Sequence, residues 1–142
     1  MATRSTIGIV NEDKSITSIY CHWDGYPENV GRILLNHYTT SDIVNELLTL
    51  GNLSQLCEKL YSDNNSHTFD KPQKGVCVAY GRDRGEKDQD AIVFEDLGEF
   101  EDSASNCWAD YQYLFDNGKW SYRNVNNTLG WRELTPQVCK TS

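Results

Sequence analysis

The sequence predicts an α+β fold, with an antiparallel sheet of about five to six strands and two to three helices inserted after the first hairpin. Three observations predict it. β-Branched and aromatic runs flank turn residues near both ends of the chain, helical periodicity is confined to residues 29–61, and strands do not alternate with helices. Segregated strands and helices are typical of α+β folds, whereas alternation is typical of parallel α/β sheets.

A length of 142 residues predicts a single domain over 1–142. We divide it into an N-terminal hairpin (6–23), a helical segment (29–61) and C-terminal strands (76–134). The 4 Trp, 8 Tyr and 4 Phe argue against a disordered chain. No apolar run approaches ~18 residues and the first residues lack a signal-peptide pattern. We therefore expect a cytoplasmic protein without a membrane span.

The first hairpin is predicted from two β-branched runs, 6–10 and 16–23, on either side of the polar turn 11–14. Residues alternate between the two faces of a strand. The more apolar face of the second strand, which we expect to face the core, carries Thr17, Ile19, Cys21 and Trp23. His22 then points toward a second layer, a cleft or solvent.

Helical spacing follows a break at Gly25 and Pro27. Apolar residues recur at helical intervals over 30–38 and again over 43–50, where 39–42 predicts an N-cap and Gly51 a C-terminal stop. A third short helix is predicted over 53–61. The polar stretch 62–67 is expected to be a loop.

The C-terminal half is predicted to form mainly strands. Runs at 76–80 and 91–94 flank a charged loop, 81–86, that is bracketed by glycines, and an acidic irregular or helical piece follows to residue 106. A β-hairpin is predicted at 111–123, because its Asp-Asn-Gly turn places Gly where φ > 0 is favoured. Trp131 and Leu134 are expected to pack back on the core.

The cysteines and the charge limit the function. Five cysteines without a C-x-x-C pair indicate reduced, packed thiols, so we expect no disulfide framework, metal or cofactor.

The net charge is −8, and residues 83–116 hold 11 acidic and two basic residues, a local charge of −9. This disfavours direct nucleic-acid binding. The acidic segment is either a solubility feature or a surface for a basic partner protein.

Three polar clusters are candidate sites. His22 and Asp24, within 20–26, could act as a general acid–base pair or as two metal ligands. The structural interpretation, which the sequence favours, is that His22 satisfies a loop backbone and Asp24 nucleates the turn. Two arginines within 81–86 could grip a phosphate or carboxylate, or be neutralised by the neighbouring acids. Residues 3–6 could join either cluster or form a solvated terminus. The candidate ligand-binding residues are Arg4, Tyr20, His22, Trp23, Asp24, Tyr26, Arg82 and Arg84; no residue is assigned as catalytic.

Three strings together resemble a family of small uncharacterised proteins encoded by tailed bacteriophages and prophages. These are ATRSTI (2–7), YCHWDGY (20–26) and YGRDRGE (80–86). The similarity runs from residue 2 to about residue 86 and returns at the hairpin near 111–122. The resemblance implies a phage context and no mechanism.

The leading hypothesis is a non-enzymatic phage accessory protein that binds and modulates a host or phage protein through its acidic surface, as a counter-defence inhibitor would. The alternative is a protein that binds a small anionic ligand, a nucleotide or phosphorylated signal, through the loops at 20–26 and 81–86. A hydrolase using His22 and Asp24 is the third hypothesis. The aromatic content leaves a homo-oligomer open.

Overall fold

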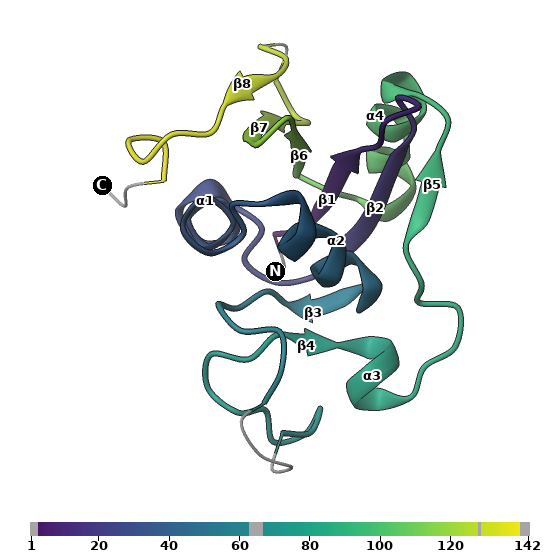
Figure 1. Ribbon diagram of the computed structural model, residues 1–142, viewed down its shortest axis with the longest axis vertical. Coiled ribbons are helices and arrows are strands. Elements are labelled where there is room, and N and C mark those ends of the chain that lie inside the picture. The colour runs from purple at the N-terminus through teal and green to yellow at the C-terminus, as the bar shows by residue number, and fades with distance from the viewer. Residues whose placement is uncertain (1–2, 63–66, 128, 140–142) are drawn as a thin grey trace.

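The computed structural model describes residues 3–62, 67–127 and 129–139, and within them the fold is α+β. Eight described strands form one mostly antiparallel sheet (Figure 1). Its order is β4 (Val78–Ala79), β3 (Leu53–Gln55), β2 (Ile16–Cys21), β1 (Ser5–Val10), β6 (Tyr111–Asp116), β7 (Lys119–Asn124) and β8 (Arg132–Glu133). β5 (Ile92–Phe94) pairs with β2 outside this path.

Helices cover both faces of the sheet. A π-helical turn, Pro27–Gly31, leads into α1 (Arg32–His37), which with α2 (Ser41–Thr49) covers one face. α4 (Leu97–Cys107) lies on the other face, and the single-turn helix α3 (Tyr80–Arg84) follows β4. Figure 1 shows α4 on the far side of β1 and β2 from α2.

The predicted hairpins and the second helix are confirmed. β1 and β2 pair antiparallel from Ser5↔Cys21 to Val10↔Ile16, and β6 and β7 pair around Asn117 and Gly118, both at positive φ. α2 begins after Thr40, whose side chain accepts a hydrogen bond from the Ile43 amide.

The main core lies between the sheet and the α1–α2 layer. Ile7 and Ile9 of β1 pack there with Ile19 and Cys21 of β2. Leu134 is buried in the same cluster, whereas Trp131 packs on the opposite face beside Phe100. The C-terminal segment therefore packs back as predicted.

The sheet is larger and more mixed than predicted. β1 pairs parallel with β6, and β2 pairs parallel with β3 at Cys21↔Leu53. The long connection between β1 and β6 permits their parallel pairing, since parallel neighbours need a crossover. Two helices, α3 and α4, lie after β4 rather than directly after the first hairpin.

The predicted helix over 53–61 is wrong. Leu53–Gln55 is strand β3, and the backbone amides of His22 and Trp23 donate to its carbonyls at Leu53 and Ser54, both at 3.0 Å. Pairing with the end of β2 satisfies backbone groups that a short, uncapped helix would leave open. The predicted loop at 81–86 is instead mostly α3, which ends at Gly85 with φ 74°. Of the stretch predicted as a loop at 62–67, residues 63–66 lie outside the described residues.

Gly8 of β1 allows α4 to sit directly on the sheet. A Cβ at Gly8 would lie 2.9 Å from Cγ2 of Ile16 and 3.2 Å from the ring of Phe100. Beside this contact, buried Gln112 donates to the Phe100 carbonyl at 2.8 Å and accepts from Nε of Arg123 at 2.7 Å. The absent side chain at Gly8 and this polar network together fix the position of α4.

We expect Gly8→Ala to destabilise the protein by about 1–3 kcal/mol, because the added methyl forces Phe100 or Ile16 to move in a packed interior. Urea unfolding measures the change, and hydrogen exchange should show reduced protection in α4. Gly98→Ala is the matched control. A Cβ at residue 98 would lie 3.4 Å from its nearest neighbour, Oδ1 of Asp96, which is an ordinary contact distance. Because alanine has a higher helix propensity than glycine, Gly98→Ala should stabilise the protein by up to about 1 kcal/mol. Equal stability of wild type and Gly8→Ala would contradict the role of the contact.

Candidate functional site

Four of the predicted ligand-binding residues lie together where β2 ends: Arg4, Tyr20, His22 and Trp23. The Tyr20 hydroxyl lies 2.7 Å from Nδ1 of His22. The rings of His22 and Trp23 meet edge to face, with 4.7 Å between their centroids. The charge of Arg4 acts on both Tyr20 and His22. Trp23, expected on the core face, is instead 45% exposed because β2 ends at Cys21.

The environment fixes the protonation of this cluster. Burial raises the pKa of Tyr20 to about 12, although nearby Arg4 opposes the shift. Burial, followed by the charge of Arg4, lowers the pKa of His22. At neutral pH the imidazole of His22 is therefore uncharged, and its tautomer decides whether the Tyr20 hydroxyl or Nδ1 is the donor between them. The cluster offers a ligand an imidazole, an aromatic edge and a guanidinium.

Asp24 and Tyr26 lie in the turn after β2 and contact each other. Asp24 has φ 54°, and its Oδ1 accepts a 3.4 Å hydrogen bond from the Tyr26 hydroxyl. Among the described residues, no hydrogen bond or ion pair joins Asp24 to His22. The acid–base pair considered for a hydrolase is therefore not formed by these two side chains in this structure.

Gly25 explains why the strings at the chain start and at 20–26 occur together. Its amide donates to the Thr3 carbonyl at 2.8 Å, and a Cβ on Gly25 would lie 2.8 Å from the Ser5 side chain. The buried Tyr113 hydroxyl closes the contact by donating to the Gly25 carbonyl at 2.6 Å. The strings at 2–7 and 20–26 therefore largely reflect packing between the first residues and the turn after β2.

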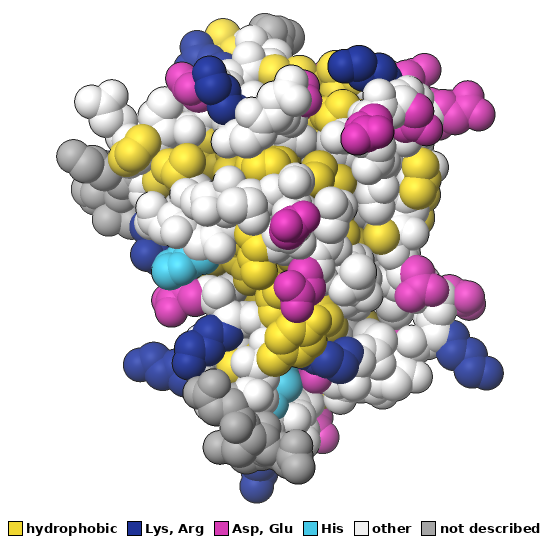
Figure 2. Space-filling view, in the orientation of Figure 1, with side chains coloured by type: hydrophobic (Ala, Val, Ile, Leu, Met, Phe, Trp, Pro, Cys, Tyr) yellow, Lys and Arg dark blue, Asp and Glu magenta, His cyan; other side chains and the backbone are white. Residues whose placement is uncertain are grey.

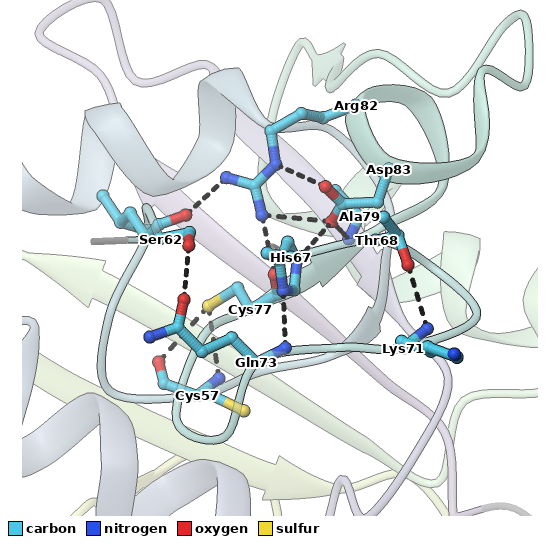
Figure 3. Close-up of polar contacts among 11 residues, drawn as sticks. Cys57, Ser62, His67, Thr68, Lys71, Gln73, Cys77, Ala79, Arg82 and Asp83 are labelled. Atoms are coloured by element: carbon cyan, nitrogen blue, oxygen red, sulfur yellow. Dashed lines mark hydrogen bonds and ion pairs between the residues drawn. The ribbon is translucent and has the colours of Figure 1, made fainter. Parts of the chain in front are cut away.

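Arg82 has its guanidinium committed to the protein itself. Figure 3 shows it pointing back from α3 into the chain, between residue 62 and the residues of β4. Nε donates to Oδ1 of Asp83 at 2.9 Å, and Nη2 donates to the Cys77 carbonyl at 2.7 Å. Nη1 donates to the carbonyl of Leu60. An anionic ligand at Arg82 would have to displace these contacts.

Asp83 is the acceptor at the centre of the same network. Its Oδ2 receives the Ala79 amide at 2.8 Å and Nε2–H of His67 at 3.1 Å. Nδ1 of His67 in turn accepts the amide of Gln73 at 2.9 Å, so both ring nitrogens are used. Burial works against ionisation, but the hydrogen bonds from Arg82, Ala79 and His67 outweigh it and hold the pKa of Asp83 below its usual value. The network ties 67–73 to α3.

Arg84 is more accessible than Arg82. Its side chain is 56% exposed, its guanidinium lies 5.0 Å from the centroid of the Phe69 ring, and Nε is 3.9 Å from Glu86. No hydrogen bond, ion pair or ring contact among the described residues joins Arg82 or Arg84 to the cluster of Arg4, Tyr20 and His22. The eight predicted residues thus form two groups, with Asp24 and Tyr26 in the turn beside the first.

The acidic segment divides into structural and free carboxylates. Asp96 caps α4 by accepting the Glu99 amide at 2.9 Å, and Glu101 accepts Nε1–H of Trp131 at 2.6 Å. By contrast, no hydrogen bond or ion pair of the described residues engages the exposed carboxylates of Asp88, Asp90 and Glu95.

An exposed apolar strand lies between these free carboxylates. Ile92 and Val93 of β5 are 57% and 62% exposed, and Leu97 at the start of α4 is 39% exposed. β5 pairs with β2 on one edge, and no described strand pairs with its other edge. Figure 2 shows apolar surface over β5 on the right side of the molecule, with acidic groups above and below it. We name Asp88, Asp90, Ile92, Val93, Glu95 and Leu97 the β5 edge.

The residues of the β5 edge are absent from the predicted site. The run at 91–94 reads like any short buried strand, so its exposure is not visible in the sequence. A sequence feature that could have indicated this surface is the position of Asp90 and Glu95, which directly flank an apolar run within the most acidic segment.

All five cysteines are unpaired in the structure, and Cys21, Cys77 and Cys139 are buried. Burial raises the pKa of Cys21 and of Cys57 to about 12 in each case. Cys77 lies against Cys57, whose amide is 3.2 Å from the Cys77 sulfur. Within the described residues, no group of three or more His, Cys, Asp or Glu side chains could hold a metal ion.

Comparison of the chain with family models, curated proteins and solved structures gives no match. The resemblance to phage-encoded proteins therefore remains an expectation from the sequence. None of the described helices has the length and apolar character needed to cross a bilayer.

We expect Asp83→Asn to destabilise the protein at pH 7 by about 2 kcal/mol, since it removes a buried charge-assisted network. The folded-state pKa of Asp83 is lowered, so the carboxylate stabilises the fold above its unfolded-state pKa of about 3.9 and stops doing so as pH falls through the folded value. The stability difference between wild type and variant should therefore shrink as pH falls below the unfolded-state pKa and through the lower folded-state value. Urea unfolding between pH 2 and 7 measures it.

Asp102→Asn is the control for removing one carboxylate, because Asp102 is exposed and its side chain forms no hydrogen bond or ion pair with the described residues. It should change stability by less than about 0.5 kcal/mol at every pH. A pH-independent loss in Asp83→Asn would show that the charge of Asp83 is not what stabilises the network.

Proposed function

We propose that the protein is a non-enzymatic binding protein whose β5 edge docks a partner protein with a basic surface. The observation that carries the proposal is the exposure of Ile92 and Val93 on an unpaired strand edge, between carboxylates that the fold does not use. Proteins normally protect such edges with short strands, charges or a covering element. An apolar centre with a charged rim is the usual composition of a docking surface.

Strand addition is the binding mode that this geometry favours. An extended segment of the partner would add to the free edge of β5, so its backbone would supply hydrogen bonds and its side chains would contact Ile92 and Val93. Lys or Arg residues beside that segment would meet Asp90 and Glu95. A second copy of this chain is a poor occupant, because two acidic edges would repel one another.

The resemblance to phage-encoded proteins favours a host or phage protein as the partner. Binding would modulate that protein, and occlusion of a basic functional surface is the form that fits a counter-defence inhibitor. Such an encounter would take place in the bacterial cytosol. The carboxylates of the β5 edge would steer association and make it sensitive to salt.

We expect immobilised protein to retain a specific partner from host lysate at about 50 mM salt and to lose it progressively toward 500 mM, as screening weakens the charge contacts. Replacing Ile92 and Val93 by Ser should abolish capture. Neutralising the rim with Asp88→Asn, Asp90→Asn and Glu95→Gln should reduce capture and flatten its salt dependence. Quantitative mass spectrometry of the retained proteins provides the measurement.

Two control variants change exposed residues outside the β5 edge. Leu129→Ser removes a leucine that is 60% exposed, and Glu58→Gln, Asp116→Asn and Glu133→Gln remove three exposed charges. Both should capture the partner like wild type. The proposal fails if no specific partner is retained at low salt, or if the β5 and control variants behave alike. It also fails if wild type is a dimer that the Ile92 and Val93 substitutions dissociate.

A further inference from the structure

The sheet carries a hollow on each of its faces beside β5. The α4-face hollow, of about 200 Å³, lies between β2, β5 and the C-terminal half of α4. The α2-face hollow, of about 400 Å³, lies between β2, α2 and residues 90–91, directly before β5. A segment added to the free edge of β5 therefore has a hollow on either side of the sheet.

The register of β5 on β2 decides which side chains point to each face. Ile92 pairs with Ser18, and both line the α4-face hollow together with Phe94. Val93 pairs with Thr17, which lines the α2-face hollow. Successive residues of an added segment must alternate between the same two faces, whichever way the segment runs. Neighbouring residues of the segment therefore meet different hollows.

The α4-face hollow suits an apolar side chain. Its surface is largely apolar, with Ile19, Ile92 and Phe94 in its lining, and none of the described carboxylates lines it. Ile92 is 57% exposed in the absence of a partner. An apolar side chain placed over this lining removes apolar surface from water, which is the main favourable contribution to association.

The α2-face hollow suits a basic side chain. Asp90 lines it, is exposed, and forms no hydrogen bond or ion pair with the described residues. Asn45 and Thr49 of α2 add side-chain oxygens to the same lining. Val93 is exposed on this face of β5, so the apolar stem of a Lys or Arg can pack on it while the charged end reaches Asp90.

The backbone of β5 can hold such a segment in register. Residues 92–94 pair with β2 on one edge, and no other backbone hydrogen bond of the described residues engages them. Backbone N–H and C=O groups of the segment would bond to the free edge, while its side chains are left to contact the two faces. The backbone supplies attachment and the hollows supply selectivity.

We propose that the β5 edge selects an extended segment in which apolar and basic residues alternate. The apolar side chains lie on the α4 face and the Lys or Arg side chains lie on the α2 face. This inference rests on the docking function proposed above and adds the sequence pattern of the partner segment. Attraction between charges alone would accept any basic surface, whereas two chemically different hollows on opposite faces accept one pattern.

The test measures binding of fluorescein-labelled heptapeptides to the full-length protein by fluorescence anisotropy, at about 50 mM salt so that charge contacts are little screened. The alternating peptide is Lys-Leu-Lys-Leu-Lys-Leu-Lys, and the block peptide, Lys-Lys-Lys-Lys-Leu-Leu-Leu, has the same composition and charge. We expect the alternating peptide to bind at least about tenfold more tightly. Because the charges are equal, the difference reports the order of the residues.

Backbone methylation checks that the peptide binds as an added strand. Methyl groups on the three Leu amides, or on the last three Lys amides, block opposite edges of the bound segment, because successive amides point to opposite edges. One of these two peptides should lose binding, and the other should bind within about threefold of the unmethylated peptide.

Charge reversal checks the position of the basic residues. Asp90→Lys should weaken binding of the alternating Lys peptide by at least about tenfold and should create binding of Glu-Leu-Glu-Leu-Glu-Leu-Glu. Asp116→Lys is the matched control, because it changes the net charge equally at the exposed end of β6. It should bind the Lys peptide within about twofold of wild type.

Equal affinity for the alternating and block peptides would overturn the inference, as would equal effects of the two methylation patterns or of the two charge reversals. No binding of the alternating peptide at about 1 mM would also overturn it. If partner capture from lysate still depends on Ile92 and Val93 in that case, the docking function stands and only the pattern is wrong. If the peptides show the expected preference but lysate yields no partner, the docking function fails and the selectivity of the edge stands.

Discussion

The contact between Phe100 and Gly8 positions most of what lies on the second face of the sheet. Because Gly8 has no side chain, the ring of Phe100 reaches the backbone of the central strand, and α4 lies flat across β1 and β2. Trp131 then stacks on Phe100 with 6.2 Å between ring centroids, which draws the C-terminal segment onto the same face. The position of α4 in turn sets where its acidic first turn lies.

The elements that the sequence predicts well are those set by local interactions. The turn at Asn117 and Gly118 and the Thr40 cap act within a few residues, so their patterns are readable. β3 depends instead on pairing between Cys21 and Leu53, and β1 pairs with β6 across more than 100 residues. Apolar spacing over 53–61 is compatible with a helix or an extended chain, and only the free edge of β2 decides between them.

The candidate site shows the same division. Strand alternation puts Tyr20 and His22 on one face, and that is enough to predict that they meet. A glycine-flanked pair of arginines, however, gives no sign that Arg82 turns inward to carbonyls of Leu60 and Cys77. Exposure of Ile92 and Val93 is equally hidden, because it results from the absence of a neighbour rather than from the residues themselves. Which strand edges are paired is decided only when the whole sheet assembles.

The buried thiols have a consequence for the chemical reactivity of the whole chain. Alkylation and thiol–disulfide exchange proceed through the thiolate, and a thiol with a pKa of about 12 is ionised in only about one molecule in 10⁵ at pH 7. Cys21 and Cys77 are in addition shielded from solvent. Modification of Cys21 and Cys77 must therefore wait for the core to open, so the rate at which these two thiols are labelled reports the rate of unfolding.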